Sequence, residues 1–362
     1  MRILCIIDSL GSGGAQRQLV GLVRLLKEHL FEVKLIWYHS IDFYQSYLDE
    51  YEVSYENRHP QGKLAKIGYI RRMIGEYRPD IVIAYLDGPT MISCLLHLLG
   101  AKFKLIVSER NTTQLLTVNE KIKFHLYRWA DAIVPNSYSQ AEYIQKNFPS
   151  LAKKVYPITN FVETDKFAPP ISVSNKASLS CRILVVGRIV EQKNVLTFLD
   201  AVRIIVDKGY LIEVHWYGKP YTQTYNDQCL TKRRELGLEH IVSFHGESND
   251  IRTAYWDSDV FCLPSLYEGF PNVICEAMAC GLPVLCSKVC DNPLIVEDSK
   301  NGFLFDPSSA ENIASAFIRF QRLDTDEKES MKKHSRKLAE EKFSMNNFIS
   351  QYMKVIQIVS QK

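Results

Sequence analysis

The sequence lacks any hydrophobic run of the roughly 18–20 residues needed to cross a lipid bilayer. The apolar stretch at its beginning, residues 2–8, is short and ends in an aspartate, so it predicts a β-strand and not a signal peptide. Low-complexity segments and internal repeats are absent too. These absences favour a globular protein, which we expect in the cytoplasm.

Patterns typical of disulfide frameworks and metal sites are also missing. The nine cysteines, an odd number, include no Cys-x-x-Cys pair, and none of the nine histidines has a partner at metal-ligand spacing. We therefore expect free thiols in a reducing compartment. The run Asp257-Ser258-Asp259 matches the D-x-D pattern of metal-dependent transferases, but it lies where a helix passes into a strand, and we interpret it as a turn. No metal and no cofactor are expected.

The chain is long enough for two domains. It has 362 residues, of which 46 % are hydrophobic and 23 % charged, and single cores rarely exceed about 200 residues. Short apolar runs alternate with amphipathic stretches, which is typical of βαβ units. The pattern breaks near Ala168-Pro169-Pro170, and the polar segment 171–180 predicts a linker. Strands are predicted at residues 2–8, 33–38, 81–85, 105–108 and 132–135, then at 182–186, 213–217, 242–244, 260–263 and 283–286.

These patterns predict the α/β fold class, with two Rossmann-like, doubly wound domains that face a cleft. The first domain is expected at residues 1–170 and the second at 171–344. The tail predicts two helices, and the last of them, at about residues 345–362, is expected to cross back onto the first domain.

A glycine-rich loop, Gly11-Ser12-Gly13-Gly14, follows the first predicted strand and precedes a helix. Bare glycine backbone lets a phosphate or sugar approach the helix N-terminus. A dinucleotide fingerprint would need a third glycine at Gln16, and the second strand ends in Trp37-Tyr38-His39 without a ribose-binding acid, so a dehydrogenase is disfavoured. A tight turn that merely requires glycine is the alternative.

The equivalent loop of the second half, residues 187–194, carries two cations. Arg188 leaves the carboxyl end of a strand and Lys193 is predicted to begin the next helix, so both charges and the helix dipole converge on one point. A diphosphate suits that point, because charge-assisted hydrogen bonds are about twice as strong as neutral ones. Two solvated surface cations are the alternative.

Two glutamates lie in the next predicted loop and helix, residues 264–280. Glu276 stands among apolar neighbours, either at the cleft-facing end of the helix or buried. A buried carboxylate needs hydrogen-bond donors, and the vicinal hydroxyls of a ribose supply two. Glu268, in a glycine-containing loop, could meet the hydroxyls of a transferred sugar. Stabilisation of Glu276 by the helix dipole alone is the alternative.

These segments together resemble retaining glycosyltransferase family 4. The run from Glu268 to Glu276 looks like that family's donor-site motif, and Gly187-Arg188 with Lys193-Asn194 looks like its diphosphate motif. The resemblance spans nearly the whole chain. Further matches are Gly13-Gly14, Gly246, Asn301-Gly302-Phe303-Leu304 and the segment Ala277-Met278-Ala279-Cys280-Gly281-Leu282-Pro283-Val284.

The resemblance implies the two-domain GT-B architecture, a nucleotide-diphosphate sugar as co-substrate, and retention of the anomeric configuration without a metal. By the same resemblance, Arg188 and Lys193 hold the diphosphate, Glu276 the ribose and Glu268 the donor hexose. Gly14 would approach the phosphate from the first domain. The other donor-binding residues it implies are Gly187, Gly246, Gly269, Phe270, Pro271 and Asn272.

Two segments depart from the family pattern. A common Gly-Gly-x-Pro-Glu run is replaced by Cys290-Asp291-Asn292-Pro293-Leu294. Where many relatives place a histidine facing the donor sugar, this chain has Ser108-Glu109-Arg110-Asn111, which resembles a subset acting on bacterial surface glycans. We expect Glu109, Arg110 and Asn111, with Gly13, on the acceptor side, and Glu109 to assist catalysis beside Arg188, Lys193 and Glu268. Packing, or a salt bridge between Glu109 and Arg110, is the alternative.

The expected activity is transfer of a hexose or N-acetylhexosamine, by resemblance from a UDP-sugar, to a glycan or lipid-linked acceptor of a cell-surface polysaccharide such as lipopolysaccharide, O-antigen or capsule. A nucleotide-sugar epimerase of the same architecture and a non-catalytic nucleotide-sugar-binding protein are the alternatives.

Two predicted helices combine basic and apolar residues, and they suit the inner face of an anionic membrane. Ordinary amphipathic helices packed on a sheet explain them equally well. The net charge of +3 is too small for an extended nucleic-acid track. The basic residues are Lys63, Lys66, Arg71 and Arg72 in the first helix and Lys121, Lys123 and Arg128 in the second.

Overall fold

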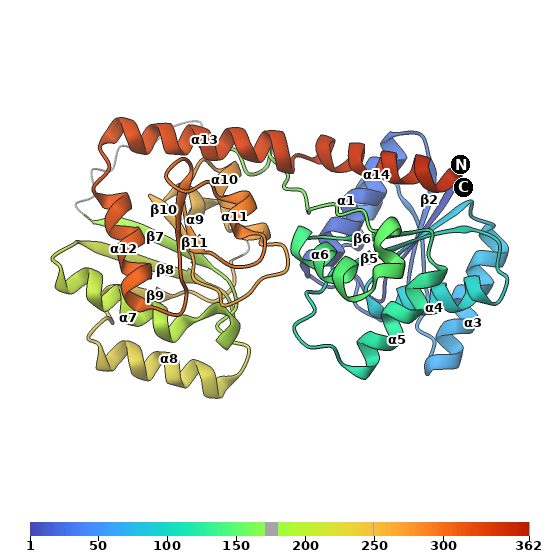
Figure 1. Ribbon diagram of the computed structural model, residues 1–362, viewed down its shortest axis with the longest axis horizontal. Helices are drawn as coiled ribbons and strands as arrows, with labels where there is room; N and C mark the ends of the chain where they lie inside the picture. Colours follow the sequence, from blue (N-terminus) through green and yellow to red (C-terminus); the bar gives the residue numbers. More distant parts are fainter. Residues whose placement is uncertain (171–179, 249, 362) are drawn as a thin grey trace. The chain divides into compact units, whose positions relative to one another are not determined.

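Each half of the chain folds around its own parallel sheet, as the sequence predicts, and each sheet has six strands where five were expected (Figure 1). The computed structural model describes residues 1–170, 180–248 and 250–361. The chain separates into one unit of Met1–Asn160 with Met345–Lys362 and a second unit of Phe161–Ser344. The first unit therefore ends before the expected boundary at residue 170. Most of the predicted linker, residues 171–179, lies outside the described residues.

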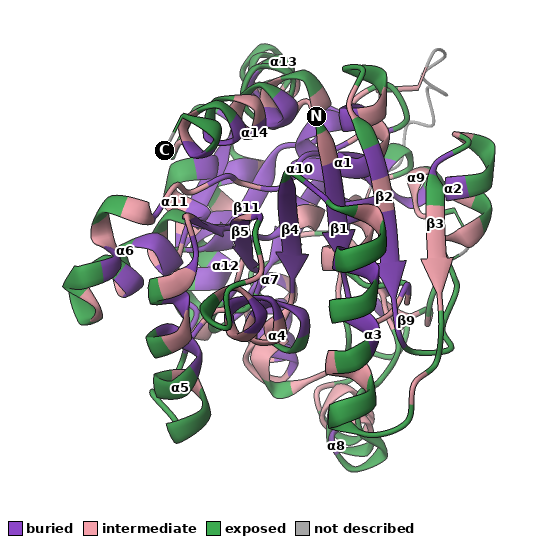
Figure 2. Ribbon diagram, turned by 90° about the vertical axis from the view of Figure 1, so that its right-hand side faces the viewer, coloured by how far each residue is buried: buried purple, intermediate pink, exposed green. Residues whose placement is uncertain are grey.

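The sheet of the first unit has the order β3-β2-β1-β4-β5-β6. Its central strands β1 and β4 are buried along most of their length, whereas β3 lies half-buried at the edge (Figure 2). The strands are β1 (Arg2–Ile6), β2 (Glu32–Trp37), β3 (Ser54–Asn57), β4 (Ile81–Tyr85), β5 (Lys104–Glu109) and β6 (Ala132–Pro135). The helices are α1 (Gly14–Glu28), α2 (Gln45–Glu50), α3 (Lys63–Tyr77), α4 (Asp87–Leu98), α5 (Val118–Leu126), α6 (Tyr138–Asn147) and α14 (Met345–Ser360).

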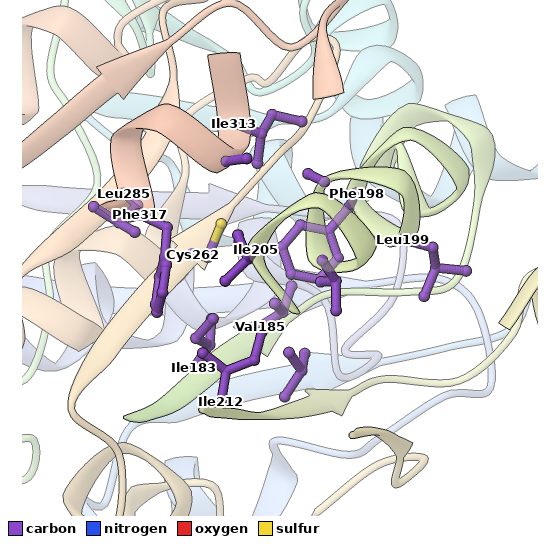
Figure 3. Close-up of a cluster of buried hydrophobic side chains, with 14 of the residues drawn as sticks. Ile183, Val185, Phe198, Leu199, Ile205, Ile212, Cys262, Leu285, Ile313 and Phe317 are labelled. Atoms are coloured by element: carbon purple, nitrogen blue, oxygen red, sulfur yellow. The ribbon is translucent and has the colours of Figure 1, made fainter. Parts of the chain in front are cut away.

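The sheet of the second unit has the order β12-β11-β10-β7-β8-β9, so β7 and β10 are neighbours. Between the sheet and helices α7 and α12 lies an apolar core that includes Val185, Phe198 and Phe317 (Figure 3). The strands are β7 (Cys181–Val186), β8 (Ile212–Tyr217), β9 (Val242–Phe244), β10 (Val260–Leu263), β11 (Val284–Ser287) and β12 (Gly302–Phe305). The helices are α7 (Val195–Asp207), α8 (Gln223–Glu235), α9 (Arg252–Trp256), α10 (Asn272–Ala279), α11 (Asn292–Ile295), α12 (Ala310–Gln321) and α13 (Thr325–Phe343).

Two edge strands, β3 and β12, were not predicted. The sequence of β3 is Ser-Tyr-Glu-Asn, which has no apolar run because an edge strand faces solvent on one side. Strand β12 has only four residues and opens with a glycine. Hydrophobic periodicity detects neither kind of strand well.

The last helix, α14, belongs to the first unit, where a buried hydrogen-bond network holds it. The hydroxyl of Tyr352 lies 2.7 Å from that of Tyr85, and the guanidinium of Arg110 donates to both hydroxyls at 2.7 Å. Arg110 also donates to Ser108 at 2.7 Å and to the amide oxygen of Asn160 at 2.9 Å. One arginine thus links two strand ends to the C-terminal helix.

Candidate active site

Three glycines shape the carboxyl edge of the second sheet. Gly218 has φ 152°, and a Cβ there would overlap the carbonyl of Gly187. Its N–H donates to the carbonyl of Gly246 at 2.6 Å. A Cβ at Gly187 would in turn lie 3.1 Å from Cε of Lys193. Glycine at these positions lets three loops approach closely and leaves room for a lysine stem.

The centre of this edge is an ion pair between two residues predicted for the donor site. Nζ of Lys193 lies 2.5 Å from Oε1 of Glu268, and their side chains are only 14 % and 9 % exposed. Lys193 follows β7 and Glu268 follows β10, and these strands pair in the sheet. The residues assigned by resemblance to the diphosphate and to the donor hexose therefore contact each other.

Two hydrogen bonds hold the two loops beside this pair. The side-chain amide of Gln192 donates to the backbone carbonyl of Tyr267 at 2.8 Å, and the backbone N–H of Leu266 donates to the carbonyl of Gln192 at 2.8 Å. The prediction that Lys193 begins a helix is wrong. Lys193 ends the 3₁₀ turn Glu191–Lys193, and Asn194, in the left-handed conformation, separates it from α7. The expected convergence of the helix dipole with Lys193 at the first turn of a helix is therefore not found.

Arg188, the other predicted diphosphate ligand, takes a different direction. It is exposed, and its guanidinium carbon lies 5.1 Å from the ring centroid of Tyr221. The predicted convergence of Arg188 and Lys193 is thus not seen in the side chains, although both leave the carboxyl end of β7. An arginine stacked on an exposed aromatic ring is held loosely enough to rotate toward an anion.

Glu276 is buried, which decides between the two positions left open by the sequence. It lies on α10 with 4 % exposure, and its Oε2 accepts a hydrogen bond of 3.1 Å from the hydroxyl of Tyr255. Tyr255 lies on α9, and nothing in the sequence pattern around it marked it as a partner of a glutamate.

The loop that joins the two glutamates is well packed. Phe270 is buried and meets the ring of Phe343 edge-on at 5.7 Å between centroids, Pro271 precedes the first turn of α10, and Asn272 begins it. Gly269 lies between Glu268 and this buried segment. Nearby, Asp291 and Asn292 are buried, and the amide of Asn292 donates to the carbonyl of Ser287 at 2.9 Å. The segment that departs from the family pattern thus closes a turn after β11.

In the first unit, Gly13 precedes α1 and Gly14 is its first residue, at the carboxyl end of β1. A Cβ on Gly13 would overlap the amide oxygen of Gln16. The amide end of Gln16 is flexible and Gly13 has φ −77°, so the turn itself does not require glycine at this position. The N-terminal amides of α1 lie at the edge where ligands of parallel sheets bind.

Glu109 lies in a buried ionic network. Lys123 places its Nζ 3.0 Å from Oε2 of Glu109 and 3.1 Å from Oδ1 of Asp87, and the hydroxyl of Tyr127 donates to Glu109 at 2.9 Å. Glu109 and Lys123 are 1 % and 2 % exposed, whereas Asp87 is 50 % exposed. Burial raises the pKa of Glu109, and the ammonium of Lys123 opposes that rise. Desolvation lowers the pKa of Lys123, but its two carboxylate neighbours outweigh this and leave it raised.

This network corrects two interpretations of the sequence. Glu109 and Arg110 do not form a salt bridge with each other, because each belongs to a separate buried network. Lys123 cannot touch a membrane surface, because its ammonium points inward to Glu109 and Asp87. Of the acceptor-side candidates, Glu109 and Arg110 are buried, whereas Gly13 and Asn111 are exposed. The N–H of Asn111 lies 3.4 Å from Oε1 of Glu109.

The D-x-D run has a structural role. The carboxylate of Asp259 accepts a hydrogen bond of 2.8 Å from the N–H of Arg182, at the start of β7. Within the described residues, no group of three or more His, Cys, Asp or Glu side chains is arranged to hold a metal ion. No helix in that part of the chain is long and apolar enough to cross a membrane.

Two family models match consecutive parts of the chain. The model described as Glycosyltransferase Family 4 matches residues 12–166, and the model described as Glycosyl transferases group 1 matches residues 180–322. The matched segments correspond to the two units, and together they include both glutamates and the loop after β7.

Similar proteins and structures agree with these matches. A UDP-Gal:alpha-D-GlcNAc-diphosphoundecaprenol alpha-1,3-galactosyltransferase of Escherichia coli is 32 % identical over 176 residues, covering 46 % of this chain and 45 % of that protein. An N-acetylgalactosamine-N,N'-diacetylbacillosaminyl-diphospho-undecaprenol 4-alpha-N-acetylgalactosaminyltransferase of Campylobacter jejuni is 28 % identical over 301 residues, covering 78 % and 79 %. The structure of a glycosyltransferase from Rickettsia africae superposes with a TM-score of 0.88 at 19 % identity, covering 100 % of this chain and 99 % of that one. The structure of Anabaena Alr3699/HepE in complex with UDP superposes with a TM-score of 0.87 at 20 % identity, covering 99 % of this chain and 100 % of that one.

The fold and the matched segments define a glycosyltransferase of the GT-B class. Its two halves are a Glycosyltransferase Family 4 domain and a Glycosyl transferases group 1 domain.

The buried ion pair predicts a stability effect. Lys193→Met leaves the carboxylate of Glu268 buried without its ammonium, and we expect the free energy of unfolding to fall by about 3–5 kcal/mol. The double variant Lys193→Met/Glu268→Gln should recover most of that loss. Lys232→Met is the control, because its ion pair with Asp200 is 30 % and 40 % exposed and should contribute under about 1 kcal/mol. Urea unfolding measures all four proteins, and equal losses for Lys193→Met and Lys232→Met would contradict the buried pair.

Proposed function

We propose that this enzyme transfers a hexose or N-acetylhexosamine from a UDP-sugar to a glycan or lipid-linked acceptor, with retention of configuration, in the assembly of a cell-surface polysaccharide. The observation that carries the proposal is the contact between Lys193 and Glu268, which joins the expected diphosphate and sugar ligands at one strand edge. The names of the Escherichia coli and Campylobacter jejuni relatives support a diphospho-undecaprenol-linked acceptor, and UDP in the HepE complex supports the base.

The residues act by position and charge. When donor binds, the diphosphate competes with Glu268 for the ammonium of Lys193, and Arg188 turns from Tyr221 to a second phosphate oxygen. The freed carboxylate of Glu268 then accepts hydrogen bonds from the hexose hydroxyls. Negative charge that develops on the departing diphosphate is stabilised by Lys193 and Arg188 without a metal. Glu276 accepts the ribose hydroxyls.

An activity assay tests the proposal against its alternatives. Incubation with UDP-galactose or UDP-N-acetylgalactosamine and a synthetic GlcNAc-diphospho-lipid, in excess EDTA, should release UDP and give an α-linked product by NMR. An epimerase would convert the UDP-sugar without acceptor, and a non-catalytic protein would bind it and release no UDP. Loss of activity in EDTA that manganese restores would contradict metal independence.

The two glutamates should have different kinetic signatures. Glu276→Gln loses about 1.5–3 kcal/mol of charge-assisted hydrogen bonding in all, so UDP and donor should both bind roughly 10- to 150-fold more weakly. Glu268→Gln frees Lys193 and should leave UDP affinity nearly unchanged while it lowers kcat, because its contact orients the sugar.

Calorimetry with UDP and steady-state rates compare these variants with Glu235→Gln, an exposed control on α8. The reverse pattern, in which only Glu268→Gln loses UDP affinity, would show that Glu268 binds the ribose and Glu276 the hexose. No effect from either variant would remove the donor-site assignment.

Contact with an anionic membrane is proposed through an apolar tip on the first unit, because Lys123 is buried. Leu115 and Val118 are 77 % and 72 % exposed, and Leu116 and Ile122 are also exposed. Leu115 and Leu116 precede helix α5, whereas Val118, Ile122 and the exposed Lys121 lie on it. Such a combination inserts apolar side chains at the headgroup boundary while a cation meets anionic lipid.

Vesicle sedimentation tests this surface. Leu115→Glu/Val118→Glu should bind vesicles of anionic lipid less than the wild type, and binding of the wild type should weaken with salt because the Lys121 contribution is screened. Leu30→Glu/Leu211→Glu, two exposed leucines elsewhere, is the matched control. Equal sedimentation of all three proteins would exclude the apolar tip.

A further inference from the structure

Tyr255 is a buried aromatic residue whose hydroxyl meets the donor site. It lies on α9 and is 0 % exposed. Its ring meets Phe167 edge-on at 6.1 Å between centroids and Phe261 at 5.9 Å. Because these rings fill the space around it, the ring of Tyr255 has no room to rotate, and its hydroxyl oxygen has a fixed position.

That hydroxyl has two acceptors, both on α10. Oε2 of Glu276 lies at 3.1 Å and the carbonyl of Val273 at 3.3 Å. A phenol has one proton to donate, and the charged carboxylate is the stronger acceptor. Glu276 has three side-chain torsions to immobilise, and a fixed donor on one oxygen sets the plane of its carboxylate in advance of binding.

We propose that Tyr255 is a positioning residue, which orients Glu276 so that the site selects ribonucleoside over 2′-deoxyribonucleoside diphosphate sugars. The inference rests on the proposed contact of Glu276 with the ribose. A carboxylate accepts both hydrogen bonds from a vicinal diol only when its plane matches that of the two hydroxyls. A deoxyribose lacks one of these donors. The buried carboxylate is then desolvated on binding but gains only one hydrogen bond in return, so the deoxyribose binds more weakly. A carboxylate free to turn would adapt to either sugar and discriminate less.

Calorimetry with UDP and 2′-deoxy-UDP tests the inference on the whole protein. The wild type should bind UDP about 10- to 100-fold more tightly than 2′-deoxy-UDP. In Tyr255→Phe the affinity ratio of UDP to 2′-deoxy-UDP should fall below about threefold, because the carboxylate of Glu276 has lost its orienting donor. In Glu276→Gln the ratio should fall equally, because the charge of the carboxylate is lost. Tyr225→Phe, which changes a buried tyrosine on α8 of the same unit, should keep the wild-type ratio.

The ratio separates positioning from packing, because a merely structural loss weakens both ligands by the same factor. An unchanged ratio in Tyr255→Phe overturns the inference, and so does a wild type that binds both nucleotides equally. If Tyr255→Phe does not fold, as judged by near-ultraviolet circular dichroism, the wild-type and Glu276→Gln ratios still decide whether the carboxylate discriminates. A wild type that binds none of UDP, GDP and ADP contradicts the proposed function itself, and the role of Tyr255 falls with it.

Discussion

The ion pair between Lys193 and Glu268 is the constraint on which the rest of the donor side depends. Its partners are 75 positions apart in the sequence, and they meet because β7 and β10 are adjacent in the sheet. Two charges taken out of water must satisfy each other, since an unpaired one costs several kcal/mol. The pair therefore holds the loop after β7 against the loop after β10.

The same strand edge explains why the two glutamates differ. Glu268 lies in a loop against a cation, so a diphosphate can release it. Glu276 is on a buried helix against the hydroxyl of Tyr255, a neutral donor inside an aromatic cluster that no ligand displaces. In the proposed mechanism, Glu268 exchanges partners when the donor binds, whereas Glu276 is oriented beforehand. Preorganisation of this second kind reduces the entropy cost of recognition.

Charge is managed differently in the first unit. Lys123 neutralises the buried Glu109 and reaches the half-exposed Asp87, while Arg110 is surrounded by hydroxyl and amide oxygens that include Tyr352 of α14. Neither network needs a ligand for its hydrogen bonds. Glu109 and Arg110, which were expected on the acceptor side, thus stabilise the carboxyl edge of β4 and β5. At that edge Asp87 is half-exposed and Asn111 is exposed.

The sequence by itself determined the parallel α/β class, ten of the twelve strands in the described part of the chain, and the return of the last helix, because buried strands and amphipathic helices leave local patterns. The residues of the donor motif were proposed from their resemblance to a family. It could not show that Lys193 pairs with Glu268, that Tyr255 holds Glu276, or that Lys123 turns inward from an amphipathic helix. Those are contacts between segments far apart in the chain, and periodicity gives the face of a helix but not the partner it meets. Only the order of strands, and the packing it imposes, decided them.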